Sequence, residues 1–426
     1  MMTRKIPFVF KHSRAENLCL VAAVALVLLM CGELSGGTQF AGGIPSSRTL
    51  RSMGRIYMAY GDYAKARPIL EQALDTATKN NAADTEVCSC LIDLAWLYNS
   101  EGRLADAEKM CELGWKLQEK AYYKEHPYIA YTLRLLSSVY QGQGKYKQAK
   151  AALDRAMEIM LKCHPADDQV MAPFYVDIGK LMAAQGDFSE AETRYLQAMQ
   201  LVNNSYGPEH LYTASVLGEV AGLYVQEARY AEAESLIGRT LAIQERIYGT
   251  DHYLLAPAWL TMARISRARM DFDGAEKLLQ KAMAAVEKKQ GMTHPLAGQI
   301  LNAMGELYFA QGRFTEAENA SRQAAQVLEN SLGPENDATA MAYNNLAKLY
   351  IRQARYAQAQ DLCQRALTSL ENAFNPNHPD IAEVLNTLAQ VYQQTGNAAE
   401  AARVVKRADE ITLHRQVAYG PVAKAE

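Results

Sequence analysis

The sequence predicts an all-α fold, a solenoid of about nine antiparallel helix pairs stacked one on the next. The chain has 426 residues, where an ordinary domain has ~150, so it must either divide into domains or repeat itself. An aromatic residue followed three positions later by alanine recurs every 42 residues, as at Tyr146 and Ala149 or at Phe188 and Ala191. The composition agrees, because 24 tyrosines beside only 13 prolines favour helices and one recurring tyrosine position.

The first residues have the pattern of an export signal. Four basic residues precede an uncharged apolar stretch at 18–30, namely Arg4, Lys5, Lys11 and Arg14. A helix over those 13 residues rises only ~20 Å, short of the ~30 Å hydrocarbon core of a bilayer. We therefore expect residues 1–31 to be a signal peptide, with an N-terminal membrane anchor as the alternative.

This signal predicts a protein that is exported, either periplasmic or tethered to the membrane and facing the envelope. Cys31 also resembles the cleavage site of a bacterial lipoprotein, but Met30 stands where that motif has a small residue. Residues 32–47 are rich in Gly and Ser without a helical period and are predicted to be a flexible linker. The nine repeats occupy residues 48–415, and 416–426 form a C-terminal tail.

Each repeat is predicted to be two helices joined by a tight turn. The first helix carries an apolar residue followed by a small one thirteen positions before the repeated alanine, as in Leu346-Ala347. A glycine such as Gly144 usually ends this helix, and the second helix begins at the aromatic residue. One such pair does not offset ~1–2 kcal/mol of backbone ordering per residue, so its remaining apolar face must pack on the next pair.

These columns resemble the tetratricopeptide repeat, whose pattern of Leu-small, Tyr, Gly, aromatic and Ala they match. The 42-residue period and joints such as Tyr248–His252 resemble the longer repeat of kinesin light chains, and so does the run Tyr343–Tyr350. The resemblance implies a right-handed α-solenoid in which the first helices line a concave groove for protein or peptide partners. The export signal suggests a bacterial envelope member of this class.

The resemblance places candidate binding residues on the groove side of the first helices. Asparagine side chains donate and accept hydrogen bonds, so a row of them suits the backbone of an extended peptide. The candidates are Asn302, Asn344, Asn345 and Asn386, with Arg264, Lys348, Arg352 and Gln390. The alternative is that these asparagines only bond neighbouring helices.

A second candidate surface is basic. Arg48, Arg51 and Arg55 lie three and four positions apart on one predicted helix, with Arg134 in a comparable column two repeats later. They suit an acidic segment or a carboxylate, or they form the solvated face of a terminal helix.

No residues indicate a metal, a cofactor or catalysis. Five of the eight histidines share one phase of the repeat, just before the first helix, which indicates structural joints; they are His126, His210, His252, His294 and His378. Cys111 and Cys363 occupy an apolar column and are predicted core residues, although a disulfide from Cys111 to Cys88 or Cys90 stays open. No recognised catalytic motif occurs.

The charge balance bears on the class of partner. Lys and Arg number 44 against 47 Asp and Glu, which disfavours nucleic acid as a partner. The sequence thus predicts a non-catalytic scaffold that binds extended segments or partner proteins in its groove. The alternative is a regulatory or substrate-presenting subunit of an envelope enzyme or transport complex.

Overall fold

The computed structural model describes residues 45–59, 62–166 and 168–419, which fall into two units. The first unit, residues 1–81, contains the pair α2 (Ser47–Ala59) and α3 (Tyr63–Lys79). The second unit, residues 82–426, contains all the later helices. The predicted signal or anchor and the linker up to residue 44 lie outside the described residues.

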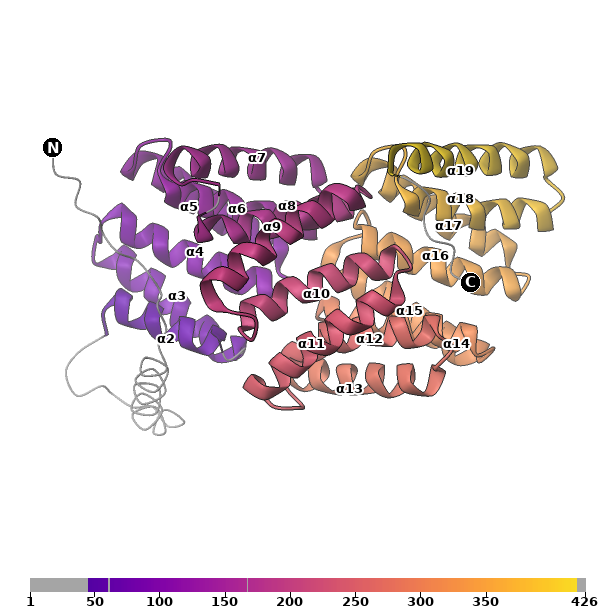
Figure 1. Cartoon of the computed structure of the whole chain (residues 1–426), viewed down its shortest axis with the longest axis horizontal. Helices are drawn as coiled ribbons and strands as arrows, with labels where there is room; N and C mark the ends of the chain where they lie inside the picture. The colour runs from indigo at the N-terminus through magenta and orange to yellow at the C-terminus, as the bar shows by residue number, and fades with distance from the viewer. Residues whose placement is uncertain (1–44, 60–61, 167, 420–426) are drawn as a thin grey trace. The chain divides into compact units, whose positions relative to one another are not determined.

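The second unit is a succession of helix pairs (Figure 1). Its helices are α4 (Asp84–Ser100), α5 (Leu104–Ala121), α6 (Pro127–Gly142), α7 (Tyr146–Cys163), α8 (Ala172–Ala184), α9 (Phe188–Tyr206), α10 (Leu211–Gln226), α11 (Tyr230–Tyr248), α12 (Ala256–Ala268), α13 (Phe272–Gln290), α14 (Pro295–Ala310), α15 (Phe314–Leu332), α16 (Asp337–Arg352), α17 (Tyr356–Ala373), α18 (Pro379–Gln394) and α19 (Ala398–Tyr419). Short 3-10 turns at Gln169–Met171 and Tyr253–Leu255 precede α8 and α12. The described residues contain no β-strand.

The predicted all-α solenoid is therefore confirmed, and each second helix after the first unit begins at the predicted position of the 42-residue repeat. The last helix continues to Tyr419, beyond the predicted boundary at 415, because no residue before Gly420 interrupts a helix. None of the described helices is both long and apolar enough to span a bilayer.

Small residues hold the two helices of a pair close together. The repeated alanine of the second helix is fully buried in most pairs, as for Ala149 and Ala233, both 0% exposed. In α8 the small residue is Gly179, where an added Cβ would lie 2.6 Å from the Tyr195 ring. The crossing thus has no room for another carbon atom.

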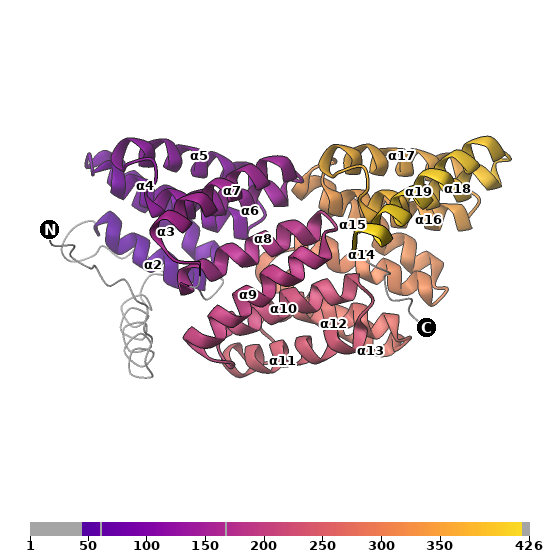
Figure 2. The same cartoon turned by 45° about the horizontal axis from the view of Figure 1, so that its top comes forward.

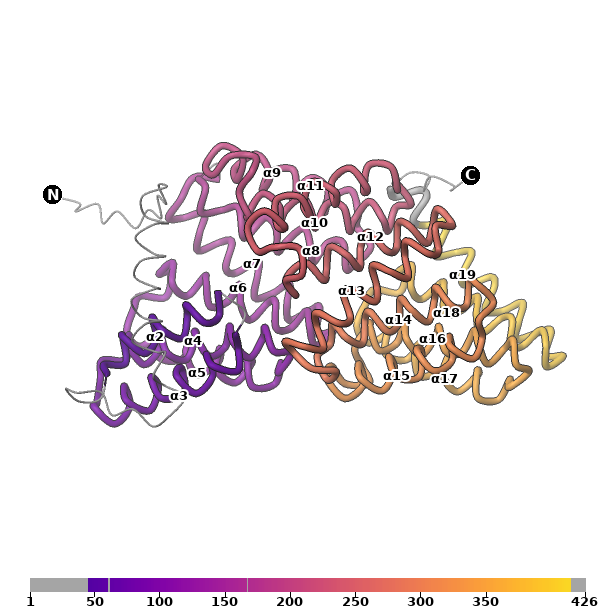
Figure 3. Tube along the Cα trace, turned by 90° about the horizontal axis from the view of Figure 1, so that it is seen from below, coloured from indigo at the N-terminus to yellow at the C-terminus, as the bar shows by residue number. Residues whose placement is uncertain are grey.

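The first helices form the inner surface of the second unit. Successive first helices pack directly on one another, from α4 with α6 to α16 with α18, whereas contacts between successive second helices are sparse. Figures 2 and 3 show that α4–α7 and α14–α19 lie side by side, and that α8–α13 connect them in an arch. The inner surface is therefore the concave one.

The predicted joint histidines are the N-caps of the first helices. In α14, for example, Nδ1 of His294 accepts a hydrogen bond from the Leu296 amide at 3.1 Å. The same column caps seven first helices or the 3-10 turns before them, with His126, Asp168, His210, His252, His294, Asn336 and His378. Each cap satisfies an amide that the helix itself leaves unpaired.

Three of these caps also join residues that are 194 positions apart. Nε2 of His294 lies 3.1 Å from the Ser100 carbonyl, and Nε2 of His378 lies 2.7 Å from the Ala184 carbonyl. Between them, Nδ2 of Asn336 donates to the Gly142 carbonyl at 2.8 Å. We call these three contacts the inter-turn seam. Through them the starts of α14, α16 and α18 rest on the ends of α4, α6 and α8.

The seam explains the glycines that follow α4 and α8. Gly102 has φ +73° and Gly186 has φ +78°, a left-handed conformation that favours glycine. An added Cβ would lie 2.6 Å from Cδ of Pro295 and 2.9 Å from Cδ of Pro379, respectively. In the same column Met270 keeps φ +62° and is 79% exposed. The turn thus accepts a larger residue where the space is open, whereas at Gly102 and Gly186 the adjacent proline leaves room only for glycine.

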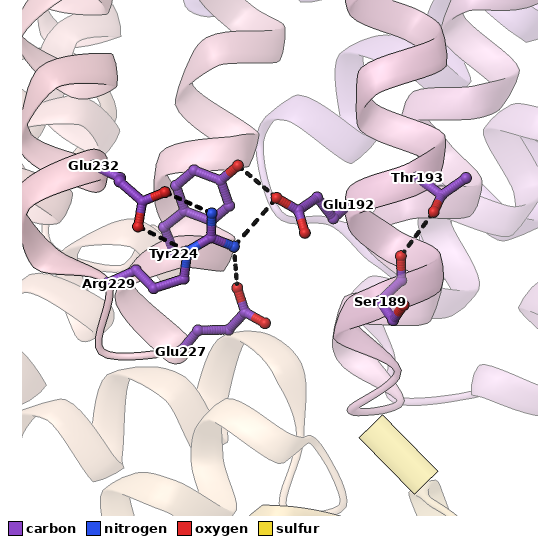
Figure 4. A network of polar contacts seen from close by, with 7 residues as sticks. All are labelled: Ser189, Glu192, Thr193, Tyr224, Glu227, Arg229 and Glu232. Atoms are coloured by element: carbon purple, nitrogen blue, oxygen red, sulfur yellow. Dashed lines mark hydrogen bonds and ion pairs between the residues drawn. The ribbon is translucent and has the colours of Figure 1, made fainter. Parts of the chain in front are cut away.

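Polar networks fasten four of the second helices to the preceding repeat, and Figure 4 shows the one at the start of α11. The Arg229 guanidinium lies 3.6 Å from the Tyr224 ring centre and pairs with Glu192 of α9 at 3.1 Å, and with Glu227 and Glu232. Burial, with the hydrogen bond that Tyr224 donates to Glu192, raises the pKa of Tyr224 to about 12. Equivalent pairs recur, namely Lys145–Glu108, Arg313–Glu276 and Arg355–Glu318.

Substitution at two helical glycines separates the packing cost from helix propensity. We expect Gly179→Ala to lower the free energy of unfolding by about 1–3 kcal/mol, because its Cβ meets the Tyr195 ring. Gly222→Ala, in α10 with nothing within 4 Å, should instead raise it by about 0.5–1 kcal/mol. Urea unfolding followed by circular dichroism measures both, and shifts of the same sign would contradict the tight crossing.

Candidate binding groove

One group of predicted groove residues surrounds the carboxylate of Glu306 on α14. Oε1 of Glu306 accepts from Nδ2 of Asn302 at 3.2 Å and from Nδ2 of Asn345 at 2.8 Å. Oε2 pairs with Arg267 of α12 at 3.0 Å. Asn345 also donates to Oδ1 of Asn302 at 3.1 Å. This Glu306 cluster therefore joins three consecutive first helices.

A second group surrounds Glu383 on α18. Its Oε1 accepts from Nδ2 of Asn344 at 3.1 Å and from Nζ of Lys348 at 2.7 Å. Asn344 is fully buried, and its Oδ1 has no hydrogen-bond partner. Lys348 and Glu383 are therefore accessible to solvent, whereas Asn344 is not. For Asn344, the structure therefore agrees with the alternative prediction, in which the asparagines only bond neighbouring helices.

A cavity of about 390 Å³ lies between the two groups. Glu306, Asn345, Lys348 and Glu383 line it on the polar side, and apolar side chains complete the wall, with Phe309, Met341 and Leu349. The cavity thus combines hydrogen-bonding groups with an apolar wall, as binding pockets usually do.

The other four candidates do not join these groups. Arg264, Arg352, Asn386 and Gln390 are exposed and make no hydrogen bond or ion pair to the described residues. Desolvation by the surrounding protein lowers the pKa of Arg264 although its side chain is solvent-accessible, and the nearby charge of Glu306 opposes that shift. The Arg352 guanidinium lies 5.5 Å from the Phe314 ring centre. These side chains are available to a ligand.

The sequence reasoning missed Arg267, Glu306 and Glu383. The signal for Glu306 was its position four residues after Asn302, which places both on one helical face. The roles of Arg267 and Glu383 depend on contacts between repeats, which spacing within one helix does not give.

The predicted basic patch is divided between the two units. Arg48, Arg51 and Arg55 belong to α2 in the first unit. Arg134 belongs to α6 in the second unit and pairs with Asp177 of α8 at 3.0 Å. Only 16% of the Arg134 side chain is exposed, so it is a partner of α8 rather than an open anion site.

The cysteines are free thiols in the described residues. Cys111 and Cys363 are fully buried, as predicted for core residues, and burial raises the pKa of each thiol to about 12. Cys88 and Cys90 are also buried and unbonded to Cys111. Across residues 45–59, 62–166 and 168–419, no three His, Cys, Asp or Glu side chains converge as a metal site would require.

Comparison with known proteins gives one family and several similar structures. A family model described as a tetratricopeptide repeat matches residues 46–114, 100–162, 170–246, 215–288, 254–330, 296–372 and 338–412. A Rap protein complexed with competence and sporulation factor is similar at 14% identity and a TM-score of 0.55, over 79% of this chain and 100% of that chain. No curated protein matches the chain.

Two further structures are similar over about half of this chain. BtubC (BKLC) from P. vanneervenii is 21% identical with a TM-score of 0.42, over 57% of this chain and 96% of that chain. A putative kinesin light chain from Podosopora anserina with nearly identical TPR-like repeats is 22% identical with a TM-score of 0.38, over 48% and 96%.

Removing Glu306 tests whether its cluster fastens the groove helices together. We expect Glu306→Ala to lower the free energy of unfolding by about 1–3 kcal/mol, because Arg267, Asn302 and Asn345 lose a charged acceptor. The control Glu158→Ala loses one exposed ion pair with Lys162 and should change the free energy of unfolding by less than about 0.5 kcal/mol. Chemical unfolding compares the two, and equal effects would show that the cluster adds no stability.

Proposed function

The chain belongs to the tetratricopeptide repeat family, and from this premise we propose that it is a non-catalytic scaffold holding an extended segment of a partner protein in the concave groove of its second unit. The four exposed side chains without polar partners, Arg264, Arg352, Asn386 and Gln390, carry the proposal. Polar groups that bond neither each other nor the fold are the ones a ligand engages without breaking existing contacts.

The Glu306 and Glu383 clusters have a different role in this proposal. Their carboxylates already accept two or more hydrogen bonds each, so a partner must exchange bonds there rather than add them. Each new hydrogen bond contributes about 0.5–1.5 kcal/mol net, which association costs readily offset. Apolar side chains of the partner must therefore fill the cavity beside Phe309 and Met341.

One structural neighbour supports a ligand on this fold. The Rap protein, whose fold is shared at a TM-score of 0.55, was crystallised in complex with competence and sporulation factor. At 14% identity the likeness concerns the fold, so the ligand of this chain is proposed from its own groove residues.

Removing two exposed groove side chains tests the function. We expect Arg264→Ala with Asn386→Ala to weaken capture of partner proteins from a cell extract about tenfold, because two hydrogen-bonding groups of about 0.5–1.5 kcal/mol each are lost. Both side chains are exposed, so helicity should not change.

The matched control is Lys277→Ala with Gln364→Ala, one cation and one amide exposed on the second helices α13 and α17. It should leave capture unchanged. Photo-crosslinking from benzoylphenylalanine at position 386, but not at 277, should label the same partners. Equal loss with both double variants would refute the groove assignment.

We also propose that the protein is exported, on the basis of the basic and apolar pattern of residues 1–31. In cells that produce the full chain, the protein recovered in the envelope fraction should be shortened near residue 31. Arg4→Glu with Lys5→Glu should reduce export because the basic start of the signal is lost. Mass spectrometry of fractionated cells measures both, and full-length protein confined to the cytoplasmic fraction would contradict export.

A further inference from the structure

One column of the second helices, four residues after the repeated alanine, faces the small residue of the first helix. The column contains Leu70, Cys111, Leu153, Tyr195, Ile237, Leu279, Ser321, Cys363 and Val405. Where the small residue is glycine, the column residue is the first atom group that an added Cβ would meet, in the pairs Gly54 with Leu70, Gly179 with Tyr195 and Gly305 with Ser321. Ser321 is the smallest of the nine column residues, and it faces a glycine.

The groove cavity extends to this pair of small residues. Gly305 and Ser321 line the cavity of about 390 Å³ together with Phe309, Met341 and Leu349. Only 1% of Ser321 is exposed, and its hydroxyl has no hydrogen-bond partner among the residues that the structure describes. A buried hydroxyl without a partner costs free energy. At the edge of a cavity, such a group is suited to a ligand that brings the missing partner.

We propose that this cavity is a pocket for a tyrosine side chain of the bound partner segment, with the phenol hydroxyl paired to Ser321. The inference rests on the proposed function, because the segment in the groove supplies the tyrosine. The ring lies against the apolar wall formed by Phe309, Met341 and Leu349. Rotation about the single Cα–Cβ bond of Ser321 turns its hydroxyl toward the phenol. We call this site the tyrosine pocket.

The charges around the tyrosine pocket favour a neutral occupant. Arg267 pairs with Glu306 at 3.0 Å, and Lys348 pairs with Glu383 at 2.7 Å. All four side chains line the cavity, so two cations and two carboxylates there already neutralise one another. A charged side chain would lose its hydration in the pocket without gaining an unpaired counter-charge. The occupant therefore combines a large apolar body with an uncharged polar end.

A phenol meets these requirements better than other aromatic groups. The hydroxyl of Ser321 both donates and accepts hydrogen bonds, and so does a phenol, whereas an indole only donates. A phenylalanine ring would leave the serine unpaired. The chain itself shows that a tyrosine ring packs closely on a glycine of this column, because Tyr195 covers Gly179 in the α8–α9 pair.

Binding of p-cresol, the tyrosine side chain without its backbone, tests the tyrosine pocket on the full chain. Ligand-observed NMR titrations give the affinities of p-cresol and of toluene, which lacks the hydroxyl. We expect p-cresol to bind the wild type and to shift the methyl resonance of Met341 in a chain with ¹³C-labelled methionine methyl groups. Met341→Leu assigns that resonance. Absence of p-cresol binding, or binding without a shift at Met341, would overturn the proposal.

Two substitutions of Ser321 separate the volume of the pocket from its hydroxyl. Ser321→Leu reproduces the pair of Leu70 with Gly54, fills the cavity and should abolish p-cresol binding. Ser321→Ala keeps the cavity and removes the hydroxyl, so the ratio of p-cresol to toluene affinity should fall about tenfold. The alanine variant also serves if the leucine variant does not fold. An affinity ratio in Ser321→Ala equal to that of the wild type would overturn the hydroxyl contact.

Partner capture shows whether the phenol comes from a bound segment. Ser321→Leu should weaken capture about tenfold, as Arg264→Ala with Asn386→Ala does, because the anchoring side chain is excluded. Full capture by Ser321→Leu beside lost capture by the Arg264 and Asn386 variant would overturn the tyrosine pocket and leave the groove assignment intact. Binding of p-cresol does not require a partner, so it tests the pocket even where the groove assignment fails.

Discussion

The close crossing of two helices around a small side chain is the contact on which the second unit depends. Ala149, Ala233 and their equivalents let each pair pack without a gap, and Gly179 serves the same purpose beneath Tyr195. Since a single pair buries too little apolar surface to be stable, every pair requires the next one. The side chains left on the inner surface of the first helices then become the groove.

Periodicity accounts for most of what was predictable. The aromatic and alanine columns located the second helices, and the phase of the histidines located the starts of the first helices. The tyrosine column was visible as well, but its pairing with cations such as Arg229 and Arg313 was not. Those pairs depend on a glutamate 37 residues earlier, a spacing that belongs to the stack of repeats and not to one helix.

The groove shows the limit of such reasoning. The asparagine row was located correctly on the first helices, yet Asn302 and Asn345 share Glu306, and Asn344 is buried against Glu383. Whether a polar side chain meets solvent or a neighbour is decided between repeats, where one sequence gives no spacing rule. Likewise, nothing in the sequence indicates that residues 194 positions apart meet in the folded chain, so the seam was not predictable.

The seam also changes how this array is expected to fold. An ordinary solenoid has only neighbour contacts, so folding can begin in any repeat and spread from there. Here the last three repeats make all their hydrogen bonds only after they contact residues 194 positions earlier in the chain. Such distant contacts raise the contact order of the chain. During synthesis the ends of α4, α6 and α8 therefore stay exposed to solvent until α14, α16 and α18 have been made. The docking of these later helices on the earlier ones is thus a late and cooperative step.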